Sequence, residues 1–169
     1  MQTTTLKLYS LSYTQLKTYL LALGFVAGNI VLPQICHLVP QGGFIFLPIY
    51  FFTLLAAYKY GWKVGLLTAV LSPVLNHLLF GMPPLAVLPA ILTKSLLLVA
   101  AASLAAHYFK TVSLLILVGV VLCYQILGSA VEWAILGDFG LAIQDFKLGI
   151  PGMLLQVLCV NMLIKKLNF

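Results

Sequence analysis

Long apolar runs, broken by short polar stretches, fill almost the whole chain. A helix needs roughly 20 apolar residues to cross a bilayer, and most of the runs are near that length. They predict an all-α membrane protein, with one integral membrane domain over residues 1–169. The six predicted transmembrane helices cover residues 16–35, 44–57, 64–80, 85–108, 112–136 and 146–164.

The composition excludes a soluble globular protein. The chain of 169 residues is 63% hydrophobic and 7% charged, with a mean hydropathy of +1.13, whereas soluble domains carry about 25% charged residues. The loops between the predicted helices are too short to contain a separate nucleotide-binding module. Residues 1–15 are rich in Thr, Tyr and Ser and show no signal-peptide cleavage site, so we expect the first apolar run to remain as a helix.

The net charge of +6 comes from nine lysines, and the chain has no arginine. The lysines are scattered between apolar runs, so they indicate membrane topology rather than nucleic-acid binding. With the N-terminus inside, the external loops hold only Lys147, beside Asp138 and Asp145. Lysine-rich loops stay in the cytoplasm, which predicts that both termini are cytoplasmic. The lysines on the predicted cytoplasmic face are Lys7, Lys17, Lys59, Lys63, Lys110, Lys165 and Lys166.

Ionisable and polar residues inside apolar runs are candidates for function, because a charge in hydrocarbon must be paired or solvated. Lys94 lies about nine residues into the fourth predicted helix, roughly 14 Å deep at 1.5 Å per residue. It must meet an acid, a water-filled cavity or an anionic ligand. An ion pair with Glu132 is the purely structural alternative.

Near the outer end of the fifth predicted helix, Glu132 shares a face with Gln125 and Gly128, and Tyr124 and Trp133 lie beside it. A glycine opens space there, while a carboxylate, an amide and aromatic rings line it. This set predicts a pocket for a ligand with a ring and a polar or cationic group. For Trp133, anchoring at the membrane interface is an equal alternative.

Other polar residues fall at the same predicted external end. Asn76 and His77 lie on a polar face of the third helix and either line the pocket or bond to neighbouring helices. His37 and Gln41 belong to a glycine-rich first loop that either folds over the pocket or is simply solvated. Gln156, in the middle of the sixth helix, either completes the pocket or packs against a neighbour.

The stretch from His37 to Lys94, about a third of the chain, resembles the substrate-binding S components of energy-coupling-factor transporters. These are six-helix, vitamin-binding membrane proteins of about this length. The most specific shared piece is the Gly-Met-Pro-Pro turn. The matching motifs are a Gly/Pro-rich first loop, Phe46-Leu47-Pro48, Gly61 with Gly65, Ser72-Pro73, and Gly81-Met82-Pro83-Pro84 followed by Pro89.

The resemblance implies a subunit of a prokaryotic inner or plasma membrane that binds a scarce micronutrient from outside. A transmembrane coupling protein and two partner ATPases would drive uptake by toppling the subunit in the lipid. Partners in this family dock on small residues of the first helix, here Ala22, Gly24, Ala27 and Gly28. Some members that share the turn have an acid in place of Lys94, so the charge preference for the ligand does not carry over.

Two other functions fit parts of the pattern. A stand-alone small transporter or channel needs a polar path through both membrane halves, but the inner half offers little besides Asn161. A membrane enzyme could use His37, His77 and Glu132 in acid–base chemistry. However, the sequence contains no GxxxxGK[ST], HExxH or GxSxG motif. We therefore expect no catalytic residue, no cofactor, no metal and no nucleic-acid partner.

Overall fold

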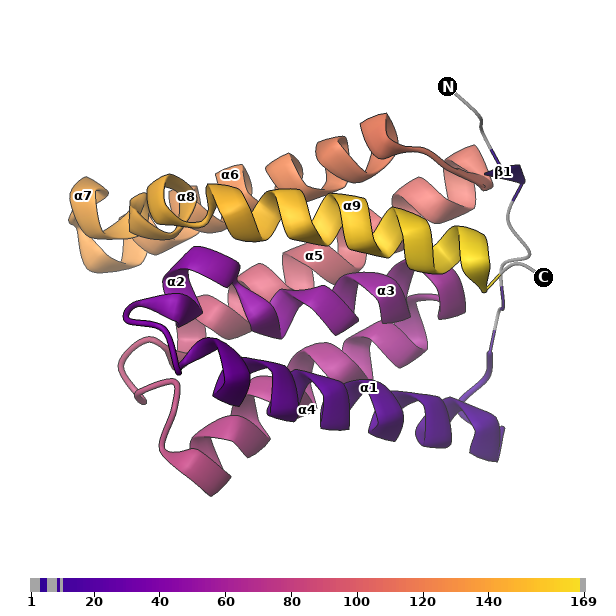
Figure 1. Ribbon diagram of the computed structural model, residues 1–169, viewed down its shortest axis with the longest axis horizontal. Coiled ribbons are helices and arrows are strands. Elements are labelled where there is room, and N and C mark those ends of the chain that lie inside the picture. The colour runs from indigo at the N-terminus through magenta and orange to yellow at the C-terminus, as the bar shows by residue number, and fades with distance from the viewer. Residues whose placement is uncertain (1–3, 6–8, 10, 168–169) are drawn as a thin grey trace.

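The computed structural model describes residues 4–5, 9 and 11–167, and they form an almost entirely helical bundle (Figure 1). The helices are α1 (Leu16–Cys36), α2 (Gly42–Phe46), the 3-10 helix η1 (Pro48–Tyr50), α3 (Phe51–Tyr60), α4 (Trp62–Phe80), α5 (Leu88–Phe109), α6 (Leu114–Leu136), α7 (Phe139–Ala142), α8 (Gln144–Leu148) and α9 (Ile150–Lys166). Two short strands, β1 (Thr4–Thr5) and β2 (Thr111–Val112), pair antiparallel.

The prediction of a helical fold is confirmed, and several helices are of the length and composition that cross membranes. Among the described residues, five helical stretches qualify: α1, Gly42–Tyr60, α4, α5 and α6. The segment Phe139–Leu148 and helix α9 would make a sixth if they act as one span, although they meet at 47°. The second stretch is not one straight helix, because the chain breaks between α2 and α3 at Leu47.

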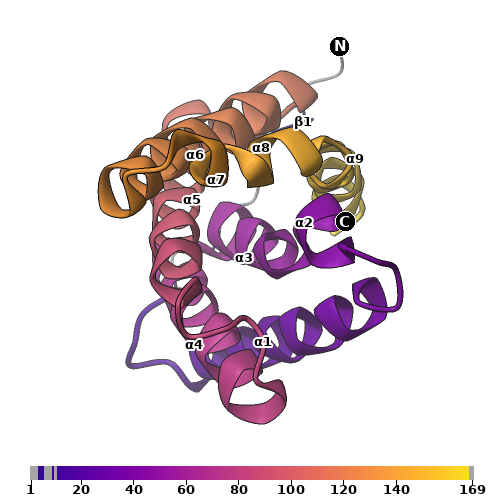
Figure 2. The ribbon, with the colours of Figure 1, turned by 90° about the vertical axis from the view of Figure 1, so that its left-hand side faces the viewer.

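Helix α3 runs through the centre of the bundle. Helices α1, α4, α5, α6 and α9 follow one another around it, and α2 lies between α1 and α9 (Figure 2). A mainly apolar helix suits such a position. Leu54, Ala56, Ala57 and Tyr58 on α3 are all fully buried. Gly65 lets α4 approach closely, because a Cβ there would lie 2.7 Å from the Ala57 Cβ.

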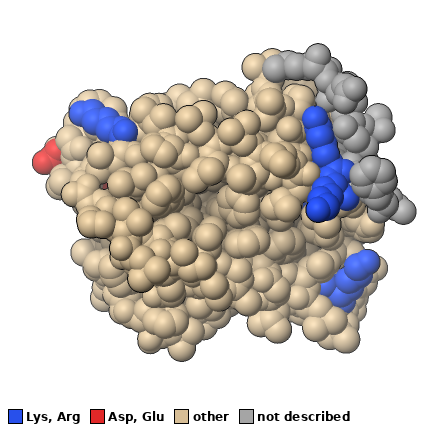
Figure 3. Space-filling view, in the orientation of Figure 1, with Lys and Arg blue, Asp and Glu red and all other residues tan. Residues whose placement is uncertain are grey.

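The outer surface of the bundle is mainly apolar. Large side chains such as Leu23 and Leu104 are more than 60% exposed, and a surface of this kind fits lipid better than water. On the face in Figure 3, the described basic side chains lie near the two ends of the molecule, and the middle carries no charge.

One end of the bundle holds most of the lysines, and we call it the lysine end. The beginnings of α1, α4 and α6 and the ends of α3, α5 and α9 meet there. Lys147 and all three acids of the chain belong to elements at the opposite end. The described lysines at the lysine end are Lys17, Lys59, Lys63, Lys110, Lys165 and Lys166.

A buried polar network joins α1, α3 and α4 in the half of the bundle away from the lysine end. The Asn29 side-chain amide donates to Thr53 Oγ1 at 3.0 Å and to Ser72 Oγ at 3.1 Å. The Asn76 amide donates to the Asn29 carbonyl at 2.9 Å. Because buried polar groups are costly without partners, these bonds fix how the three helices pack beneath the site described next.

Candidate functional site

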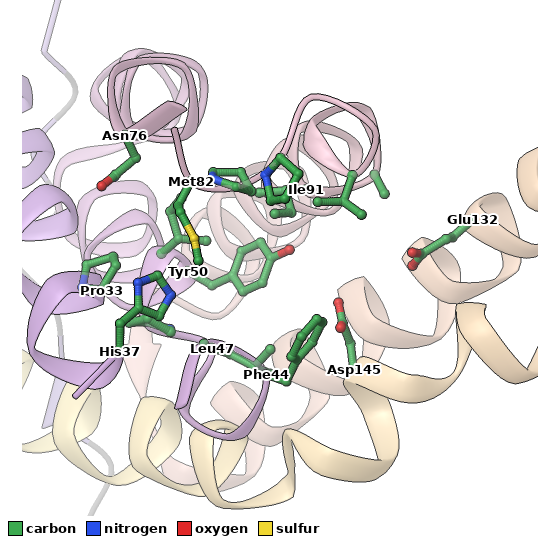
Figure 4. Close-up of a pocket in the computed structure, with 17 residues that line it drawn as sticks. Pro33, His37, Phe44, Leu47, Tyr50, Asn76, Met82, Ile91, Glu132 and Asp145 are labelled. Atoms are coloured by element: carbon green, nitrogen blue, oxygen red, sulfur yellow. The ribbon is translucent and has the colours of Figure 1, made fainter. Parts of the chain in front are cut away.

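A cavity of about 180 Å³ opens at the end of the bundle opposite the lysine end. Its walls come from the end of α1, from α2 and η1, from the turn between α4 and α5, and from α5, α6 and α8. Figure 4 shows the side chains that converge on it from these elements. The polar residues of the lining are His37, Tyr50, Asn76, Glu132 and Asp145, and most of the others are apolar.

The break between α2 and α3 forms one side of the cavity. Leu47 adopts a left-handed conformation, with φ at +47°, so η1 sets off in a new direction and places Tyr50 in the lining. The Gln156 amide donates to the Leu47 carbonyl at 3.3 Å, and the Tyr124 hydroxyl donates to the Gln156 carbonyl oxygen at 3.2 Å. Side chains from helices α6 and α9 therefore stabilise the break.

The turn between α4 and α5 forms another side. Gly81 ends α4 in the left-handed conformation that glycine favours, with φ at +67°. His77 Nδ1 lies 2.8 Å from the Pro83 carbonyl oxygen, which ties the turn back to the last turn of α4. Met82, Pro83 and Pro84 then line the cavity. A short turn, tied to α4, thus bounds this side of the cavity.

The centre of charge is a lysine held by two acids. Lys94 Nζ lies 2.6 Å from Glu132 Oε2 and 2.7 Å from Asp145 Oδ2. The lysine is 1% exposed, whereas both carboxylates reach the cavity wall. Lys94 reaches them only because Gly128 leaves room for its stem, since a Cβ on Gly128 would lie 2.5 Å from Lys94 Cγ.

The ten binding residues expected from sequence divide into three groups. His37, Asn76 and Glu132 line the cavity. Four others contact residues of its walls, as described above: Lys94, His77, Tyr124 and Gln156. The remaining three lie elsewhere: Gln41 is an exposed residue before α2, Gln125 is fully buried behind the wall, and Trp133 is half-exposed against Phe139.

Sequence reasoning did not select two polar residues of the site. The sequence pattern predicts an external loop at Asp145, whereas this residue lies on α8 and binds Lys94 across 51 positions of sequence. The scarcity of acids is a signal that points to Asp145, because the chain contains only three acids that could pair with a buried lysine. Tyr50 carried no such signal, because its place in the lining depends on the unusual backbone of Leu47.

The small residues of α1 point in two directions. Ala22 is buried, and a Cβ on Gly28 would lie 2.7 Å from the Phe52 ring, so these two residues already pack inside the bundle. Gly24 and Ala27 are exposed, and a Cβ on Gly24 would meet nothing within 4 Å. Only the second pair leaves a surface on which another helix can dock.

No protein-family model matches the chain, and no curated protein or solved structure is significantly similar to it.

Proposed function

We propose that this chain is the substrate-binding membrane subunit of an energy-coupling-factor type importer. It captures a vitamin or related micronutrient on the external side of a prokaryotic inner or plasma membrane, and partner subunits power the uptake with ATP. The observation that supports this most is the cavity, which combines apolar walls with a few converging polar groups, as small-molecule sites do.

The packing below the cavity favours a binding protein over a channel. Tyr50 and Tyr124 pack with ring centroids 5.2 Å apart. Further toward the lysine end, Leu54, Leu98 and Leu117 are fully buried within one core cluster. A channel requires a continuous polar path, whereas this apolar cluster lies between the cavity and the lysine end. Such a site releases its ligand inward only if the whole subunit moves.

The distribution of lysines supports an outward-facing cavity. Six described lysines belong to the end of the bundle farthest from the cavity, and lysine-rich ends stay in the cytoplasm. The cavity then opens toward the outside, where a scarce nutrient must be captured. Both termini of the chain are cytoplasmic in this arrangement.

The open face of α1 supports docking of a coupling subunit. Small residues let another helix approach closely in a membrane, and Gly24 and Ala27 are the exposed small residues there. The sequence carries no nucleotide-binding motif of the GxxxxGK[ST] type. A transmembrane coupling protein and two ATPases would supply that activity.

Co-expression with the coupling protein and ATPase pair of the same genome tests this function. We expect the affinity-tagged chain to retain all three partners in detergent, and Gly24→Leu to lose them because leucine fills the docking surface. Gly119→Leu is the matched control, since a Cβ on Gly119 on α6 also meets nothing within 4 Å. Failure of the wild-type chain to retain the partners, or their retention by Gly24→Leu, would contradict the proposal.

A further inference from the structure

The charge that faces the cavity is negative. Lys94 contributes one positive charge, and Glu132 and Asp145 contribute two negative charges, which leaves a net charge of −1 with histidine counted as neutral. The carboxylates line the cavity, whereas the lysine lies behind them and is not part of the lining. An incoming anion would meet the carboxylates first, whereas a cation would find acceptors.

The carboxylates retain capacity for a ligand. Lys94 contacts one oxygen of each of them, so the second oxygen of each can accept a further hydrogen bond. Hydrogen bonds from charged donors to carboxylates are the strong ones, and the side chains of these two acids are only 12% and 18% exposed. A protonated amine or amidine matches this pair best.

Tyr50 provides an independent sign that a polar ligand group belongs here. Its side chain is 2% exposed, and its hydroxyl has no hydrogen-bond partner among the described residues. The ring lines the cavity, and its hydroxyl points across the space toward the side that holds Glu132 and Asp145 (Figure 4). A buried hydroxyl without a partner is unfavourable, and a ligand donor or acceptor would remove that cost.

The size of the cavity limits the ligand to about one ring. A cavity of about 150 Å³ in another protein holds a benzene molecule, and this one measures about 180 Å³. One ring with a short substituent fits, whereas a fused three-ring system does not. The apolar side chains of Phe44, Leu47, Met82 and Ile91 would contact the ring.

We propose that the cavity binds a single-ring organic cation, with its protonated nitrogen between Glu132 and Asp145 and within reach of the Tyr50 hydroxyl. The inference rests on the proposed function and names the chemical class of the substrate. Lys94 keeps the two acids together and sets the net charge of the site to −1, which selects a ligand with one positive charge.

Four probes test the charge and the size separately: benzylamine, benzyl alcohol, benzoate and 9-(aminomethyl)anthracene. Apparent Kd values come from the dependence of the unfolding midpoint on probe concentration, with the full chain in detergent at pH 7. Benzylamine should bind at least tenfold more tightly than benzyl alcohol, benzoate or the three-ring amine. Equal or tighter binding of benzyl alcohol or benzoate, or no binding of benzylamine at 10 mM, would overturn the proposal.

Single substitutions test which side chains cause the preference for benzylamine over benzyl alcohol. Glu132→Gln and Asp145→Asn should each reduce the benzylamine advantage over benzyl alcohol to less than threefold, and Tyr50→Phe should weaken benzylamine binding severalfold. The ratio of two affinities on one protein is independent of any loss of stability. Asp138→Asn is the matched control, because Asp138 only caps α7 and lies outside the lining, so the ratio should remain unchanged. An unchanged ratio in both carboxylate variants would contradict the assignment.

The outcomes separate this inference from the proposed function. If the partners co-purify but the probe order is wrong, the chain is an importer subunit with a different ligand class. If benzylamine is preferred but no partner is retained, the ligand class stands and the importer assignment fails.

Discussion

Among single residues, a lysine deep in the apolar bundle is central to the site, and two acids hold it there. Lys94 is 1% exposed and lies within 2.7 Å of both Glu132 and Asp145. Burying charges is costly unless they are paired, so the three side chains form one unit. Removing the lysine leaves two acids without a countercharge, which is worse than removing all three side chains.

Lys94→Met should therefore destabilise the protein strongly. Two carboxylates would face each other without a countercharge, and breaking a buried pair costs about 3 kcal/mol or more. The free energy of unfolding, measured by SDS titration in mixed micelles, gives the value. The triple variant Lys94→Met/Glu132→Gln/Asp145→Asn should recover most of the loss. A triple variant as unstable as Lys94→Met would show that the charges are not the cause.

Gly128→Ala tests the space that admits the lysine stem. The added methyl group would lie 2.5 Å from Lys94 Cγ, and overpacking of this kind costs about 1–3 kcal/mol. The same SDS titration should show that loss. Gly119→Ala, on the same helix but with nothing within 4 Å, should be neutral or slightly stabilising, because alanine favours helix more than glycine does. Equal changes in the free energy of unfolding for the two variants would contradict a special role for Gly128.

At the scale of elements, two irregular segments shape the site: the break at Leu47 and the Gly-Met-Pro-Pro turn. Each is fixed by one side chain from a neighbouring turn or helix, Gln156 in the first case and His77 in the second. Both irregular segments contribute residues to the lining of the cavity. The irregular segments are therefore as important as the spans that carry them.

His77→Ala should loosen the turn without unfolding α4. The imidazole bond to the Pro83 carbonyl disappears, and we expect hydrogen exchange of the Met82 and Leu85 amides to accelerate severalfold. Benzylamine binding should weaken in parallel, because the turn forms part of the wall. His107→Ala, in the last turn of α5 and outside the cavity lining, is the control. Unchanged exchange in His77→Ala would show that the prolines alone hold the turn.

The sequence is informative where one physical effect dominates. Apolar runs require helices, so the helical class and the general positions of the long helices could be predicted. The break at Leu47 could not, because leucine rarely adopts positive φ and the Gln156 hydrogen bond to the Leu47 carbonyl comes from a helix far away in sequence. Of the two partners of Lys94, Glu132 could be predicted because it lies on a recognisable polar face of its helix. Asp145 could not, because it lies on a five-residue helix whose sequence is typical of a loop.

At the scale of the whole molecule, the chain has two unlike ends. One carries most of the lysines, and the other carries the cavity and the three acids. A bundle with this asymmetry has one preferred orientation in a membrane. The proposed function requires the orientation with the lysine end in the cytoplasm, because the cavity then opens toward the outside.

Cysteine labelling tests this orientation. In a variant with Cys36, Cys123 and Cys159 replaced by alanine, Lys147→Cys should react with a membrane-impermeant maleimide in intact cells. Lys110→Cys should react only after permeabilisation, because it belongs to the lysine end. Both positions are exposed in the structure, so access to the reagent differs only by membrane side. The reverse labelling pattern would place the cavity inside the cell and contradict capture from outside.

The most direct measurement for the whole account is native mass spectrometry of the full chain, released from detergent after mild purification. We expect the wild-type protein to carry one small molecule of about one ring in size. Ala90→Trp, which fills the cavity wall on α5, should carry none. Ala134→Trp, at an exposed position on α6 outside the lining, should still carry it. A wild-type protein with no bound molecule, or an Ala90→Trp variant that retains it, would contradict a ligand site in this cavity.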